Sequence, residues 1–220
     1  MGEISKQDEF GLALYKTIKS YNLGRILEIG SWDGTGSTRC IIDAISELEL
    51  KHIKRLVCLE INKDRFTQLV KNTKQYEWVE CYNETSISYN QLYEKDFNKI
   101  WDSPFNGLKK HPTAATREQA EKWFNDDVRN LKKAETSFLD ADDSFYDGVL
   151  IDGGEFFGYS EFKILKDRTN ILFLDDYYYG YKTNQVAREL LQDTEWDVIA
   201  GNKNLRNGYA IFKRKTFLDK

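Results

Sequence analysis

The sequence predicts an open α/β sheet, mostly parallel and covered by helices on both faces, with an antiparallel hairpin near its C-terminus. Five short runs that are apolar on both faces alternate with helical patterns, as buried parallel strands do. These runs cover residues 25–29, 55–59, 78–82, 147–151 and 171–174. Two later runs, WDVIAG and YAIFKR, flank the Asn- and Gly-rich NKNLRNG, a pattern typical of a hairpin. Together they predict seven strands.

The segments between these strands have helical periodicity, which favours right-handed crossovers. In the first segment the apolar positions of one helical face are Cys40, Ile41, Ala44, Ile45 and Leu48. In the second, Asn62 can cap a helix that buries Phe66, Leu69 and Val70. A helix after the fifth run has an apolar stripe made of Val186, Ala187, Leu190 and Leu191.

Composition narrows the class of protein and its partners. A chain of 220 residues favours one domain, 1–220. The net charge of −4 lacks the basic footprint of a nucleic-acid binder. No apolar run approaches the roughly 20 residues of a membrane span, and MGEISKQDEF does not resemble a secretory signal. The chain has three cysteines, Cys40, Cys58 and Cys81, and each lies in an apolar run. An odd number of cysteines in apolar runs favours reduced thiols over disulfides. We therefore expect a cytoplasmic protein with neither nucleic-acid nor membrane partners, its oligomeric state left open.

An insertion over about residues 88–140 separates the third and fourth strands. It is longer than a usual crossover. Thr116 and Gln119 form a capping-box pattern, and apolar residues at helical spacing follow it. This helix either packs on the flank of the domain or covers the active site. We expect part of the insertion to border the substrate pocket of that site, with an apolar surface supplied by Trp101, Phe105, Trp123 or Phe124.

The segment RILEIGSWDGTGST joins a strand to a helix through a glycine turn. Glycines allow close approach of a ligand, and the helix start presents backbone amides. The spacing is not GxGxxG, and Glu28 precedes the first glycine. A dinucleotide pyrophosphate would be repelled by this carboxylate, whereas a ligand with an amino group would suit it.

Glu60 ends the second predicted strand, about thirty residues after Gly30. In a doubly wound sheet this strand end lies beside the first turn, where a carboxylate accepts both ribose hydroxyls. The alternative is a solvated acid at the end of a strand.

These motifs resemble those of class I S-adenosylmethionine-dependent methyltransferases, which have a Rossmann-like fold. LEIGSWDGTGST resembles their first motif, and CLEINKDR the motif after their second strand. YDGVLIDGGEFFGYSEF and ILFLDDYYYG resemble regions of small-molecule O-methyltransferases of the macrocin and caffeoyl-CoA type. The resemblance spans roughly residues 20–215, apart from the insertion.

The resemblance implies a set of site residues. Glu28, Gly30 and Ser31 would face the methionine part of the cofactor, and Glu60 would hold the ribose. The adenine would lie near the segment that begins with Asn83 and Glu84. The metal ligands would be Asp152, Asp175 and Asp176. Relatives often have His at the third position after the first of these acids, where this chain has Glu155.

A physical argument that does not depend on the resemblance also favours a metal site at the three aspartates. They end neighbouring parallel strands about 4.8 Å apart, so their carboxylates can converge. Oxygen ligands suit Mg²⁺, and a metal can lower the pKa of an acceptor hydroxyl. We expect a bound Mg²⁺ here, with Asp152 taking the hydroxyl proton; the alternative is that some of these acids cap helices or face solvent.

The resemblance, together with these residues, thus implies methyl transfer from S-adenosylmethionine to a small, polar, hydroxylated acceptor, such as a sugar or a natural-product intermediate. Two alternatives stay open. One is another transferase with the same cofactor pocket, such as an aminopropyl transferase, in which the acids would surround a polyamine. The other is a non-catalytic binding protein that retains the fold.

Overall fold

A computed structural model describes residues 4–49, 54–110, 115–134 and 136–217. It contains a seven-stranded sheet with the strand order β3–β2–β1–β4–β5–β7–β6. The strands are β1 Arg25–Ile29, β2 Arg55–Leu59, β3 Val79–Tyr82, β4 Tyr146–Ile151, β5 Thr169–Asp175, β6 Trp196–Asn202 and β7 Tyr209–Arg214. Only β7 runs antiparallel to its neighbours, β5 and β6. The predicted mostly parallel sheet with a C-terminal hairpin is confirmed.

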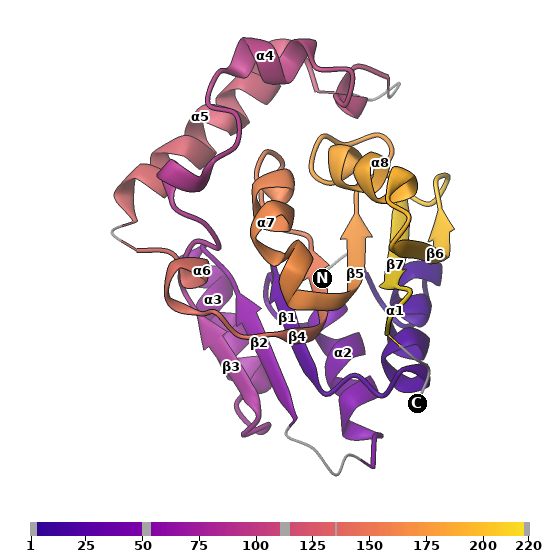
Figure 1. Ribbon diagram of the computed structural model, residues 1–220. Coiled ribbons are helices and arrows are strands. Elements are labelled where there is room, and N and C mark those ends of the chain that lie inside the picture. The colour runs from indigo at the N-terminus through magenta and orange to yellow at the C-terminus, as the bar shows by residue number, and fades with distance from the viewer. Residues whose placement is uncertain (1–3, 50–53, 111–114, 135, 218–220) are drawn as a thin grey trace.

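Helices cover both faces of this sheet (Figure 1). One face carries α1 Glu9–Ser20, α2 Ser37–Ser46 and α3 Lys63–Thr73; the other carries α7 Gly158–Leu165 and α8 Asn184–Gln192. Side chains alternate along a strand, so Leu27 packs with residues of α7 and α8, whereas Ile26 packs with residues of α1 and α2. The sheet is therefore doubly wound, as the sequence predicts.

The caps and stripes of these helices follow the sequence, with two corrections. The side chain of Asn62 accepts hydrogen bonds from the backbone N of Asp64 and of Arg65, each at 3.0 Å, and so caps α3. Leu69 is buried, but Val70 is exposed, as is Leu191 in α8. Each lies about 100° around its helix from a buried neighbour, so it falls outside a narrow apolar stripe.

The insertion contains α4 Phe97–Asp102, α5 Arg117–Lys133 and α6 Phe138–Ala141, with 3₁₀ turns at Tyr89–Gln91 and Gly107–Lys110. Residues 111–114 and 135 of the insertion lie outside the described residues. Oγ1 of Thr116 accepts a hydrogen bond from N of Gln119 at 3.2 Å and caps α5. Figure 1 shows α4 and α5 at the top of the molecule, on the side toward which β5 points.

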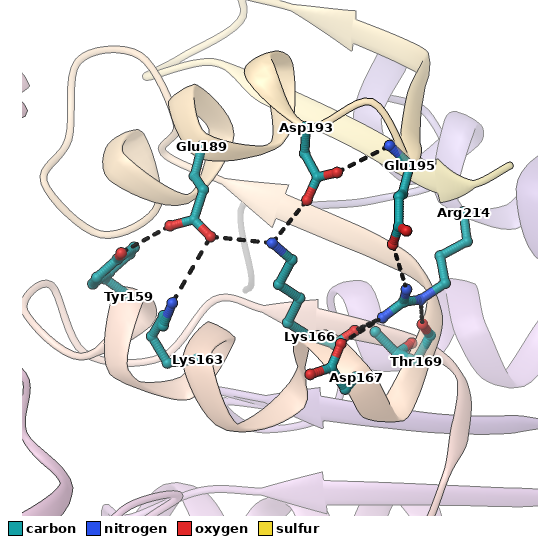
Figure 2. Close-up of polar contacts among 9 residues, drawn as sticks. All are labelled: Tyr159, Lys163, Lys166, Asp167, Thr169, Glu189, Asp193, Glu195 and Arg214. Carbon is teal, nitrogen blue, oxygen red and sulfur yellow. Dashed lines mark hydrogen bonds and ion pairs between the residues drawn. The ribbon is translucent and has the colours of Figure 1, made fainter.

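A polar network fixes α8 to the end of α7 (Figure 2). Nζ of Lys166, in the 3₁₀ turn Lys166–Arg168, lies 3.2 Å from Oε1 of Glu189 and 2.8 Å from Oδ2 of Asp193. Nε of Arg214 donates to the carbonyl of Thr169 at 3.0 Å. The network lies near the N-terminal end of β5, away from the strand ends described next. Among the described residues, no helix has both the length and the apolar character that crossing a membrane requires.

Candidate active site

A cavity of about 530 Å³ opens at the C-terminal ends of β1, β2, β4 and β5. Gly30 and Ser31 line it after β1, Glu60 after β2, Asp152 after β4, and Asp175 at the end of β5. Open α/β sheets bind ligands at this edge. Residues far apart in the sequence therefore meet at one candidate site.

Gly30 is required by the approach of β4. Its φ is +90°, and a Cβ at this position would lie 2.2 Å from the backbone O of Asp152. N of Asp152 in turn donates to O of Ile29 at 3.0 Å. N of Ser31 donates to O of Leu59, also at 3.0 Å. The turn is thus held against both neighbouring strands.

Glu28 does not reach this cavity, which corrects the expectation that it faces the cofactor. It is fully buried on the same sheet face as Ile26, beneath α2. Oγ1 of Thr38 donates to its Oε2 at 2.6 Å. Burial raises the pKa of Glu28, although hydrogen bonds oppose the shift. The carboxyl therefore bonds to α2, the helix that follows the glycine turn.

Glu60 lies where the sequence places it, in the cavity wall and 6% exposed. Its Oε2 accepts a hydrogen bond from N of Trp32 at 2.9 Å, and its Oε1 accepts one from N of Asn62 at 2.7 Å. Burial raises the pKa of this carboxyl, and the two backbone donors oppose the shift. Each carboxylate oxygen has a second lone pair, so a diol can still donate to both.

Asn83 is a second correction. Its Nδ2 donates to O of Glu60 at 2.7 Å and to O of Ile61 at 3.0 Å. It therefore fixes the turn after β2, and it does not line the cavity. The predicted Glu84 does line the cavity, as does its neighbour Thr85, whose buried Oγ1 has no hydrogen-bond partner among the described residues.

The three aspartates converge as predicted, with ligand atoms within 4.8 Å of one another. A lysine that the sequence reasoning missed lies among them. Nζ of Lys182 is 2.7 Å from Oδ1 of Asp152 and 2.8 Å from Oδ2 of Asp176. A guanidinium nitrogen of Arg206 lies 3.8 Å from Oδ1 of Asp175. Two cations therefore accompany three carboxyls.

Burial and these charges set the protonation of the cluster. Burial raises the pKa of Asp152, with Lys182 opposing the shift. It raises the pKa of Asp175 well above its ordinary value, because Asp152 and Asp176 add repulsion. Burial also opposes ionisation of Asp176, yet Lys182 outweighs it and lowers the pKa. The four carboxylates around Lys182 overcome its own burial, so its pKa is raised well above the ordinary value. The ammonium is therefore charged.

Two further acids, Asp127 and Glu161, line the cavity and were not predicted. Asp127 belongs to α5, so the insertion does border the cavity; none of the aromatic residues expected there does. Glu161 is 1% exposed; Ser86 donates to its Oε1, while its Oε2 has no partner among the described residues. Burial raises the pKa of both acids to about 7. The sequence signal for Glu161 was a lone acid within the apolar face of GYSEFKIL.

Glu155, at the position where the resemblance led us to expect a histidine, is not among the residues that line the cavity. Its Oε1 accepts hydrogen bonds from N of Tyr181 at 2.6 Å and from N of Lys182 at 3.4 Å. Burial raises its pKa to about 7. Its contacts hold the chain segment that carries Lys182.

The cavity as a whole is acidic. Its carboxyl groups belong to Glu60, Glu84, Asp127, Asp152, Glu161, Asp175 and Asp176. Its cationic side chains are those of Arg65 and Lys182. The guanidinium of Arg65 lies 3.2 Å from the ring centroid of Trp32, at the outer wall. Such a cavity favours a ligand that carries positive charge.

Comparison with known proteins supports the fold. No family model matches the chain, and no curated protein matches its sequence. Three similar solved structures are the Podospora anserina methyltransferase PaMTH1 with SAH, a Bacillus cereus O-methyltransferase with SAH, and the Streptomyces achromogenes O-methyltransferase TomG, involved in tomaymycin synthesis, with SAM. Their identities are 14%, 12% and 13%, each with a TM-score of 0.53. Each alignment covers 93% of this chain and, respectively, 77%, 80% and 78% of the other. The chain therefore has the fold of these methyltransferases.

Proposed function

We propose that this chain transfers a methyl group from S-adenosylmethionine to a hydroxyl group of a small, polar acceptor. The observation that carries the proposal is the place of Glu60, at the end of β2 beside the Gly30 turn, in a cavity rich in carboxyl groups. A ribose diol suits Glu60, and the positive charges of the cofactor suit the acidic wall. The similar structures that hold SAH or SAM support this assignment.

The cofactor supplies an activated methyl group, so the protein has to orient the acceptor and remove its proton. Asp152 is the residue we propose for proton removal, because its carboxyl lines the cavity at the end of the central strand β4. Burial raises its pKa, which makes it a better base than an ordinary surface aspartate. Asp127 places the insertion at the same cavity, so the insertion is the element we assign to acceptor recognition.

The expectation of Mg²⁺ at Asp152, Asp175 and Asp176 has an oxygen-rich set of ligands in its favour. Against it stands Lys182, whose ammonium already contacts two of these carboxyls. No step of the proposed reaction is assigned to Mg²⁺.

Calorimetry with SAH tests the cofactor assignment. Glu60→Ala should weaken binding at least about tenfold, since hydrogen bonds to a charged group contribute roughly 1.5–3 kcal/mol each. Glu77→Ala is the matched control, because Glu77 is an exposed acid ahead of β3, at the opposite end of the sheet, and should leave affinity unchanged. Melting curves without ligand verify that both variants fold. Unchanged affinity in a folded Glu60→Ala variant would remove Glu60 from the site.

Product analysis separates the alternatives. Methyl transfer converts SAM to SAH, whereas aminopropyl transfer would consume decarboxylated SAM and release methylthioadenosine. Tight binding with no turnover across hydroxylated acceptors would favour a non-catalytic binding protein.

A further inference from the structure

We propose that Lys182 is the resident cation of the aspartate cluster, so that the cluster binds no divalent metal ion and methyl transfer at this site proceeds without one. The catalytic clause rests on the function proposed above; the binding clause does not. Nζ of Lys182 lies 2.7 Å from Oδ1 of Asp152 and 2.8 Å from Oδ2 of Asp176, both normal distances for a charged hydrogen bond.

An ion and this ammonium compete for the same space. A Mg²⁺ ion sits 2.0–2.1 Å from its oxygen ligands. An ion that bridged the two oxygens held by Lys182 would therefore lie within about 4 Å of Nζ, given the contact lengths above. The two cations would repel each other strongly in a cavity wall shielded from water. Binding of the ion thus requires that Lys182 leave.

The fold gives Lys182 little freedom to leave. Its side chain is buried, and it lies just before α8, whose N-cap is Thr183. Glu155 accepts hydrogen bonds from the backbone of Tyr181 and Lys182. On the other side, a Cβ at Gly158 would lie 2.2 Å from O of Lys182, so α7 packs directly against this peptide group.

Lys182 is therefore a positioning residue. It binds Oδ1 of Asp152, a residue that lines the cavity, and so fixes the position of this carboxyl. It also joins Asp152, the residue after β4, to Asp176, the residue after β5, without any external ion. Glu155 acts one step further away, since it holds the backbone of Lys182.

Binding of Mn²⁺ tests the inference independently of any reaction. Electron paramagnetic resonance should show no Mn²⁺ bound to the wild-type chain at 100 μM ion, an expected Kd above about 1 mM. Lys182→Met removes the charge and keeps a side chain of similar length. It should create a Mn²⁺ site at least tenfold tighter, which a further Asp175→Asn change should weaken.

Lys166→Met is the matched control. Lys166 also contacts two acids, Glu189 and Asp193, but at the far end of β5 (Figure 2). It should gain no comparable site, because only two partly exposed carboxylates would be uncovered. An equal gain in this control would overturn the assignment, as would a folded Lys182→Met that binds no Mn²⁺.

The wild-type protein decides the matter even where Lys182→Met fails to fold. A Mn²⁺ site in the wild-type chain that Asp175→Asn abolishes would overturn the inference. Turnover that persists in excess chelator supports its catalytic clause, and turnover lost to chelation and restored by Mg²⁺ would overturn it. Absence of turnover under every condition would instead count against the proposed function. The Mn²⁺ binding results alone would then decide whether Lys182 excludes a metal ion from the cluster.

Discussion

Glu161 shows what a buried acid costs this fold. Its side chain is almost fully buried, and one of its carboxyl oxygens has no partner among the described residues. Burial disfavours the charged form, which raises its pKa to about 7. A protein keeps such a group at a cost in stability, and Glu161 lies in the wall of the cavity.

Stability should therefore fall as the pH rises. A carboxyl whose pKa is raised on folding stabilises the protein below its unfolded pKa, and that stabilisation is lost as the pH rises through the folded value. For Glu161 this window runs from 4.5 to about 7, and at most about 3 kcal/mol is involved. Urea unfolding at pH 5 and pH 8 should show a smaller loss for Glu161→Gln than for the wild type. Asp127 and Glu155 shift in the same direction, so some loss remains in the variant; an identical loss would contradict the assignment.

The sequence correctly predicted the position of those site residues whose place follows from strand order. Glu60, Asp152 and Asp175 each end a parallel strand, and parallel strands bring their C-terminal ends to one edge. It failed with Glu28, because both faces of a buried strand are apolar and the pattern does not tell which face an acid occupies. Lys182 could not be predicted, because its ion pairs with Asp152 and Asp176 depend on the path of the turn before α8. No local periodicity in the sequence encodes that path.

At the scale of elements, α5 packs the insertion against the segment between β4 and α7. Phe124 of α5 packs at 5.7 Å from the ring of Phe97 in α4 and at 5.4 Å from the ring of Phe156, before α7. The capping pattern and apolar spacing predicted this helix. They did not predict that Asp127, rather than the aromatic residues, would reach the cavity, because a stripe pattern fixes which residues are buried and not what buries them.

Phe124→Ala should consequently destabilise the protein by about 3 kcal/mol or more, as large-to-small changes in a core do. The neighbouring Trp123 is 39% exposed, and Trp123→Ala should cost less than half as much. Denaturant titration of the two variants measures both values. A larger loss for Trp123→Ala would show that α5 packs through the other face.

At the scale of the whole molecule, the pattern of strands and helices is distributed along the entire chain, so the doubly wound sheet could be predicted from periodicity. The electrostatic character of the cavity could not, because its carboxyl groups come from α5, from α7 and from the C-terminal ends of β2, β3, β4 and β5. A net charge of −4 over 220 residues gives no hint that seven carboxyl groups line one cavity.

This acidic wall should discriminate between the cofactor and its product in a pH-dependent way. SAM carries a sulfonium charge that SAH lacks, whereas the amino and carboxylate groups are common to both and cancel in a ratio of affinities. Asp127 and Glu161, with pKa values of about 7, pass from mostly neutral to mostly charged between pH 6 and 8. A unit charge pair about 8 Å apart contributes roughly 2 kcal/mol at an effective dielectric constant of 20.

The affinity for SAM relative to SAH should therefore rise at least about threefold from pH 6 to pH 8, allowing for partial screening. Competitive calorimetry at the two pH values measures the ratio. The double variant Asp127→Asn with Glu161→Gln should flatten the dependence, because it removes both titrating groups and keeps their shapes. Glu121→Gln is the control, since Glu121 is an exposed acid of α5 that does not line the cavity. A ratio that stays constant in the wild type would mean that the sulfonium does not sense these two acids, and would place the methyl group away from the α5 side of the cavity.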